Sequence, residues 1–141
     1  MISSPPEKNV AAKKTRRVLY VDDMRELREV ARLALSRCGH KIDCAPDGKD
    51  ALEMIRADPS AYDIIITDHH MSVMNGLELV MGLREIKYAG MIAVVSSELN
   101  EDVEVDYRRL GIERLLYKPV SLGDLRSLVL ESEPIVSVSR A

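Results

Sequence analysis

The chain has 141 residues, of which 46% are hydrophobic and 30% charged, values that suit one globular domain and exclude an intrinsically disordered chain. The formal net charge is −3, but residues 1–17 carry five basic side chains and one acidic, whereas the remainder carries 15 basic and 22 acidic. An acidic body repels phosphate backbones, so we expect no nucleic-acid binding by the folded part, although the basic leader could contact an anionic surface.

The sequence contains no signal for a membrane or for secretion. No apolar run approaches the ~20 residues of a membrane span, and the first residues lack the apolar middle of a secretory signal. The two cysteines, Cys38 and Cys44, are too few for a disulfide framework and do not have zinc-ligand spacing. We therefore expect a cytoplasmic protein that does not bind membranes.

Short apolar runs and amphipathic stretches alternate along the chain. Residues 17–21 form an apolar run that ends in two aspartates, which is typical of a buried parallel strand. Apolar residues at spacings of three and four then predict a helix over residues 24–37. Residues 41–45 form a weaker second strand, and Asp47 can cap a second helix that ends before Pro59.

The strongest strand signal is the run of three isoleucines and a threonine at residues 64–67, which leads into Asp68. The apolar side of the first helix includes Val30, and that of the last helix is expected to bury Leu122. The elements expected after residue 68 are a helix beyond the loop at 69–75, a strand at 91–95, a helix at 100–110, a strand at 113–117 and a helix that begins at Ser121.

Strands that alternate with helices in this way predict an α/β fold, a doubly wound five-stranded parallel sheet with five helices that cover both faces. Residues 1–15 are expected to form a flexible leader and residues 16–131 the folded domain. Residues 132–141 are expected to be a short tail, disordered rather than paired along an edge strand.

Polar side chains follow the predicted strands at their carboxyl ends, where doubly wound sheets bind their ligands. Carboxylates brought together there would repel one another, which a divalent cation with oxygen ligands, such as Mg²⁺, would offset. A carboxylate can also accept a phosphoryl group, whose oxygens an ammonium and a hydroxyl would stabilise. The residues at these strand ends are Asp22, Asp23, Asp68, Ser96, Ser97 and Lys118.

From about residue 16 to about residue 130 the sequence resembles the receiver domain of two-component response regulators, in a stand-alone form like that of chemotaxis regulators, with a flavodoxin-like fold. The stretches that carry the resemblance are VLYVDD, IIITDHHMSVMNG, AVVSSE and LLYKP, in the family's order and at its intervals. The resemblance implies that Asp68 is the phospho-acceptor, assisted by Lys118 and Ser96, and that Mg²⁺ or Mn²⁺ is bound. The metal ligands that it implies are Asp22 (through water), Asp23, Asp68 and the backbone carbonyl of His70.

One departure from the family's pattern concerns the output step. Leu115 occupies the position where the family usually has a switching tyrosine or phenylalanine, so the usual coupling of hydroxyl movement to ring rotation cannot operate. Tyr117 lies two residues on, on the same strand face, and either substitutes for that ring or is simply packed. His70 and Glu98 flank the acceptor and the switch hydroxyl and would tune the rate rather than catalyse. The residues expected to tune the switch or its rate are Ser97, Glu98, Leu115 and Tyr117.

We therefore expect a signalling switch rather than an enzyme, one that catalyses only its own phosphorylation and dephosphorylation. A sensor histidine kinase or a phosphotransfer protein would supply the phosphoryl group, and phosphorylation would shift a pre-existing equilibrium. The fourth helix, fifth strand and fifth helix would then bind a downstream protein or a second copy of the chain. We expect no output domain after residue 130, so the effector is expected to be another protein or a second copy of the chain.

Three alternatives stay open at this point. The first is a receiver-like docking module that binds a partner without being phosphorylated, which Leu115 mildly favours. The second is a metal-dependent phosphoesterase, because residues 68–70 spell the DHH triplet of that family; His40 is the only other histidine, and such enzymes need more ligands. The third is an aspartate-based phosphatase, which lacks its general acid here because no second aspartate follows Asp68.

Overall fold

The computed structural model describes residues 15–135, and its centre is a five-stranded parallel sheet in the order β2-β1-β3-β4-β5. The chain turns from β1 to β2 on one side and continues through β3, β4 and β5 on the other, so the order reverses between β1 and β3. The predicted doubly wound fold is confirmed. The strands are β1 (Arg17–Val21), β2 (Lys41–Ala45), β3 (Ile64–Asp68), β4 (Met91–Ser96) and β5 (Arg114–Tyr117).

Five helices connect or follow these strands, and four of them begin at a side-chain cap. In each capped helix an Asp, Asn or Ser side chain accepts a hydrogen bond from the backbone N–H three residues later, which satisfies one free donor of the first turn. Asn75 makes a complete capping box with Glu78. The helices are α2 (Arg25–Ser36), α3 (Gly48–Ala57), α4 (Gly76–Glu85), α5 (Glu101–Arg109) and α6 (Leu122–Glu131).

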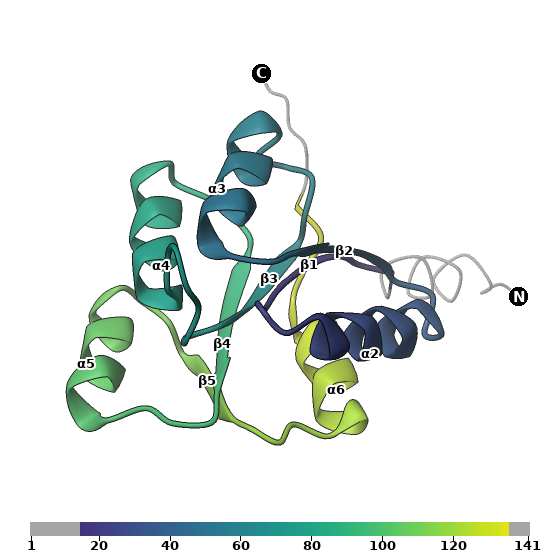
Figure 1. Ribbon diagram of the computed structural model, residues 1–141. Helices are drawn as coiled ribbons and strands as arrows, with labels where there is room; N and C mark the ends of the chain where they lie inside the picture. Colours follow the sequence, from purple (N-terminus) through teal and green to yellow (C-terminus); the bar gives the residue numbers. More distant parts are fainter. Residues whose placement is uncertain (1–14, 136–141) are drawn as a thin grey trace, which may run out of the picture.

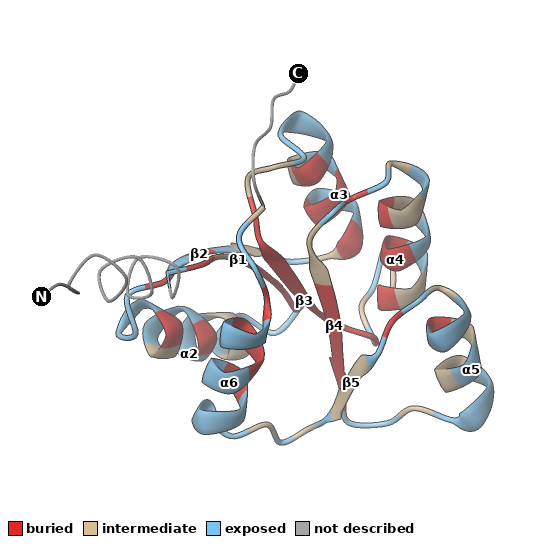
Figure 2. Ribbon diagram, turned by 180° about the vertical axis from the view of Figure 1, so that it is seen from behind, coloured by how far each residue is buried: buried red, intermediate tan, exposed pale blue. Residues whose placement is uncertain are grey.

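The helices form a layer on each face of the sheet, with α2 and α6 on one side and α3, α4 and α5 on the other (Figure 1). Successive strand residues point to opposite faces, so β1 contributes Val18 and Tyr20 to one apolar cluster and Leu19 and Val21 to the other. Figure 2 shows buried strands at the centre and one buried stripe on each helix. This arrangement leaves the carboxyl ends of all five strands at one edge of the molecule.

Two apolar side chains are more exposed than their helical spacing predicts. Val30 on α2 and Leu122 at the start of α6 are both about half exposed. They line the same groove between these helices, together with the buried side chains of Ala31 and Leu125. The helical spacing of apolar residues identifies the face of each helix that turns inward. At the border of that face, α2 and α6 leave a groove in which Val30 and Leu122 stay accessible to solvent. The expected burial of Leu122 is therefore wrong.

Both ends of the described chain are tied to the opposite, amino edge of the sheet. The carboxylate of Asp63, just before β3, accepts hydrogen bonds from the backbone N–H of Arg17 (2.8 Å) and of Ile135 (2.8 Å). Most of the expected leader and the end of the expected tail (residues 1–14 and 136–141) lie outside the described residues. Within residues 15–135 no helix combines the length and apolar character needed to cross a membrane.

Candidate functional site

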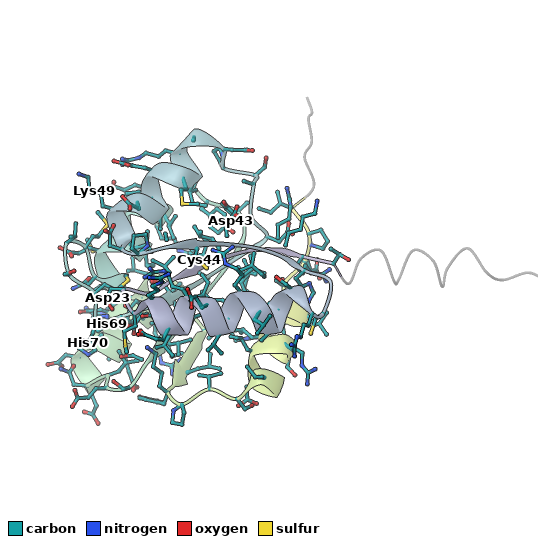
Figure 3. The ribbon with its side chains drawn as sticks, turned by 45° about the vertical axis from the view of Figure 1, so that its right-hand side comes forward. Asp23, Asp43, Cys44, Lys49, His69 and His70 are labelled. Carbon is teal, nitrogen blue, oxygen red and sulfur yellow. The ribbon has the colours of Figure 1, made fainter. Side chains whose placement is uncertain are left out.

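The side chains at three of the predicted strand ends converge on one site at the carboxyl edge of the sheet. The Nζ atom of Lys118 lies 3.2 Å from an oxygen of Asp22 and 3.5 Å from an oxygen of Asp68. Asp23 joins them, because one carboxylate oxygen from each of the three aspartates lies within 4.8 Å of the others. Figure 3 shows Asp23 grouped with His69 and His70 at one end of α2. The structure thus brings together an acidic triad and one ammonium group.

The backbone around the pocket fixes these side chains. Asp22 follows β1 directly, and its second carboxylate oxygen accepts the N–H of Met24 at 2.9 Å. Lys118 follows β5, and its own N–H donates to the carbonyl of Ser96 at the end of β4 (2.9 Å). The peptide bond between Lys118 and Pro119 is cis. The lysine is therefore anchored to the neighbouring strand while its amine reaches across the sheet edge to the aspartates.

The acceptor candidate Asp68 is a carboxylic side chain buried at the end of β3. Its side chain is 8% exposed, and burial raises its pKa, opposed by the charge of Lys118 and assisted by that of Asp22. One carboxylate oxygen accepts the N–H of His69 at 2.9 Å, and the other faces the lysine. Two carboxylates about 4 Å apart near a protein surface repel by ~4 kcal/mol, so one ammonium among three carboxylates leaves room for a divalent cation.

The predicted switch hydroxyl of Ser96 is fully buried and bonded within its own loop. It donates to the carbonyl of Glu98 (3.2 Å) and accepts the N–H of Glu98 (3.3 Å). The ring of His70 lies 3.0 Å from the same carbonyl through its Nε2 atom, while the side chains of Ser97 and His70 are exposed. Within residues 15–135 the Ser96 hydroxyl has no hydrogen bond to the acidic triad.

The two residues considered for the switching ring lie in different surroundings. Leu115 is half-buried and packs against the apolar cluster under α3, α4 and α5. Tyr117 is 51% exposed, and its hydroxyl donates to the carboxylate of Glu104 on α5. Tyr117 therefore lies on the surface between β5 and α5 rather than in the core.

Two residues at the site were not identified from the sequence. His69 is buried, and its Nδ1 lies 2.6 Å from the hydroxyl of Tyr107, which is 0% exposed. Burial, followed by the nearby charge of His70, lowers the pKa of His69, and burial, followed by the charge of Asp68, raises the pKa of Tyr107. Both groups are thus held neutral. In the sequence, Tyr107 follows Val103 by four residues, so both lie on the same face of a helix. This spacing predicts that Tyr107 is a core residue, but it does not indicate a role at the site.

The histidine pair does not form the metal site of a phosphoesterase. The cluster of metal-ligating side chains found within residues 15–135 contains the three aspartates and neither histidine. The two rings instead contact Tyr107 and the Glu98 carbonyl. The DHH triplet therefore does not indicate a phosphoesterase in this chain.

Comparisons with known proteins identify the family of this fold. Residues 18–130 match the model of the response regulator receiver domain family, so the chain belongs to that family and is a receiver domain of two-component signalling. A response regulator receiver protein from Pseudomonas putida superimposes with a TM-score of 0.75 at 33% identity, covering 82% of this chain and 95% of that one. The chemotaxis protein CheY4 of Vibrio cholerae gives a TM-score of 0.74 at 26% identity, covering 83% and 98%.

Relatives detected by sequence differ widely in length. The sensor histidine kinase AruS of Pseudomonas aeruginosa is 32% identical over 99% of this chain, which corresponds to only 14% of AruS. The two-component response regulator 24 of Arabidopsis thaliana is 30% identical, with 79% of each chain covered. This chain spans 47% of a receiver protein from Anaeromyxobacter at 33% identity. The receiver module is thus shared among proteins of different overall build.

Proposed function

We propose that the chain is a phosphorylation-dependent signalling switch whose Asp68 accepts a phosphoryl group from a phosphohistidine of a sensor kinase or phosphotransfer protein. The observation that carries the proposal is the position of the Lys118 amine, 3.2 Å from Asp22 and 3.5 Å from Asp68, beside three clustered carboxylates. Membership of the receiver family supports the same reaction. The chain would act in the cytoplasm and catalyse only its own phosphorylation and dephosphorylation.

The donor set suits Mg²⁺ or Mn²⁺, because all the available ligands are oxygens and their charge exceeds that of the single lysine. Asp23 and Asp68 would bind the ion directly, Asp22 through water, and the backbone carbonyl of His70 would complete the protein ligands. A divalent ion held there supplies positive charge to the phosphoryl oxygens during transfer.

The residues of the chain have distinct roles in the transfer. An oxygen of Asp68 attacks phosphorus, a P–O bond forms as the P–N bond of the phosphohistidine breaks, and the imidazole nitrogen keeps the electron pair. Lys118 stabilises the phosphoryl oxygens from the side on which it already contacts Asp68. The hydroxyl of Ser96 would exchange its bond to the Glu98 carbonyl for one to a phosphoryl oxygen, which draws the loop after β4 inward.

The chemistry is tested by labelling with a small phosphodonor and Mg²⁺, followed by intact mass measurement. Wild-type protein is expected to gain one phosphoryl group, and Asp68→Asn to gain none, because an amide oxygen is a far poorer nucleophile than a carboxylate of the same shape. Asp102→Ala, which removes an exposed carboxylate on α5, serves as the control and should label like wild type. Equal labelling of wild type and Asp68→Asn would refute the acceptor assignment.

The second candidate function is a docking module that is never phosphorylated, which Leu115 favours because the family's switching ring is missing there. Metal titration separates the two. Wild type is expected to bind Mg²⁺ with a Kd on the order of millimolar, and Asp23→Ala to bind at least about tenfold more weakly, because a direct ligand is lost. NMR amide shifts around Asp68 report the binding. A wild type that does not respond to Mg²⁺ would favour the docking module.

Two kinds of partner follow from the proposal. A phosphohistidine donor must approach Asp68 from the side of the exposed Asp23 and His70. A downstream protein, or a second copy of the chain, would bind the surface of α5, β5 and α6, where Tyr117 and Val105 are exposed apolar contacts. The match to a segment of the sensor histidine kinase AruS supports a place in a histidine kinase pathway.

A further inference from the structure

Helix α5 is attached to the core by one deeply buried side chain. In this fully described helix Tyr107 alone is buried, at 0% exposure, and it is the largest of the fully buried side chains in residues 15–135. The remaining residues of α5 are exposed or half-buried, and most of them are charged. A helix with so few buried contacts changes position more easily than one packed along its length. Its position therefore depends on Tyr107.

The hydroxyl of Tyr107 reaches the residue beside the acceptor. It lies 2.6 Å from Nδ1 of His69, and the two rings meet edge to face with centroids 5.5 Å apart. The backbone N–H of His69 in turn donates to the carboxylate of Asp68 at 2.9 Å. A chain of two hydrogen bonds thus runs from Asp68 through His69 to Tyr107, the anchor of α5.

The first turn of α4 packs against the contact between His69 and Tyr107. A Cβ atom at Gly76 would lie 2.6 Å from the Tyr107 hydroxyl, 2.6 Å from the Asp68 carbonyl and 2.9 Å from Cα of His69. The N–H of Gly76 also donates to the His69 carbonyl at 2.9 Å. The first turn of α4 therefore packs closely against both the Tyr107 hydroxyl and the backbone of His69, so a shift of His69 would be transmitted to these two neighbours.

We propose that Tyr107, acting through His69, is a positioning residue that couples the occupancy of the Asp68 pocket to the position of α5. The inference rests on the proposed function for the phosphoryl group, but a metal ion bound by the three aspartates would act on the same site without it. Phosphorylation converts the carboxylate that accepts the His69 N–H into an acyl phosphate: the carboxylate loses its own negative charge, and the new phosphoryl group carries about −1.5 to −2 charges, so this bond must change. Tyr107 on α5 would thus provide the aromatic link between the acceptor site and the output surface that Leu115 on β5 cannot provide. Tyr117 does not replace it, because its side chain lies at the surface.

The experiment compares wild type with Tyr107→Phe, which removes one hydroxyl and keeps the ring. Amide shifts of residues 101–105 are recorded by NMR in the free protein, with Mg²⁺ alone, and with Mg²⁺ and a small phosphodonor, and labelling is measured by intact mass. We expect Tyr107→Phe to label to the same extent as wild type. The change in the α5 amide shifts should be at least about fivefold smaller than in wild type. Equal α5 responses in both proteins overturn the inference.

A matched control separates coupling from the loss of any buried hydroxyl. Tyr88 is also buried, and its hydroxyl donates to the carbonyl of Tyr62 (2.8 Å) at the opposite edge of the sheet. Tyr88→Phe should keep the full α5 response, and a loss as large as that in Tyr107→Phe would assign the effect to general loosening and overturn the proposal.

A second variant tests whether the two residues act as one unit. His69→Phe and Tyr107→Phe should weaken the response to the same degree, and the double variant should weaken it no further, because both remove one link. Additive losses overturn the proposal. A wild type that takes no label refutes the proposed function instead, and the response to Mg²⁺ alone then decides the coupling.

Discussion

Lys118→Met is expected to lower the rate of Asp68 phosphorylation by about 10²–10³-fold, the usual loss when one preorganised charge-stabilising group is removed from a reacting centre. The amine of Lys118 contacts both Asp22 and Asp68 and is the cation closest to the point where phosphoryl charge accumulates. Methionine keeps most of the aliphatic stem, which lines the groove between α2 and α6, so the change removes mainly the charge. The rate is measured by intact mass against time at saturating Mg²⁺.

Lys49→Met is the control for this experiment, because Lys49 is an exposed lysine on α3 whose loss changes the net charge equally. It should label at the wild-type rate. A Lys118→Met protein that labels as fast as the control would show that the amine has no part in the transfer. The acidic triad and the metal would then have to account for the reaction alone.

The fold could be predicted because each strand is a short apolar run, and each run indicates a buried parallel strand. The three isoleucines of β3 are buried on both faces, as a central parallel strand requires. Three of the four helices between strands, α3, α4 and α5, begin at a side-chain cap. The rim of the site followed from the same logic, since parallel strands end at one edge. Asp22, Asp68 and Lys118 therefore had to come close whatever the details of packing.

The link between His69 and Tyr107 could not be predicted in the same way. Helical spacing indicates that Tyr107 faces inward, but it does not give the depth at which α5 lies or the residue that meets the hydroxyl. The same limit explains Leu122, whose exposure depends on how far α2 extends over α6. The bond of Ser96 to its own loop is a choice among rotamers that no sequence pattern fixes.

The two buried aspartates at the ends of β3 have pKa values shifted in opposite directions. Asp63, just before the strand, accepts bonds from Arg17 and Ile135, and although burial alone would raise its pKa, these hydrogen bonds bring the pKa below its usual value. Asp68, at the far end, has one backbone donor and a shared lysine, and burial keeps its pKa raised. A well-satisfied carboxylate stabilises the fold, whereas an under-satisfied one stays available to a metal and a phosphoryl group.

Asp63→Ala is accordingly expected to lower the free energy of unfolding by about 3 kcal/mol at pH 7, because the partly buried N–H groups of Arg17 and Ile135 lose their acceptor and each costs ~1–3 kcal/mol. The melting temperature should fall by about 10 °C. The pKa of Asp63 is depressed in the folded state, so its contribution is present above the unfolded pKa of about 4 and is lost as the pH falls through the folded pKa.

Urea unfolding of wild type and Asp63→Ala between pH 7 and about pH 3 measures this contribution directly. The difference between the two proteins should shrink as Asp63 takes up its proton in wild type. Glu53→Ala, which removes an exposed carboxylate on α3, should stay close to wild type at every pH. A difference for Asp63→Ala that stays constant to the lowest pH would mean that Asp63 stabilises the fold through its shape, because the contribution of its charge must disappear there.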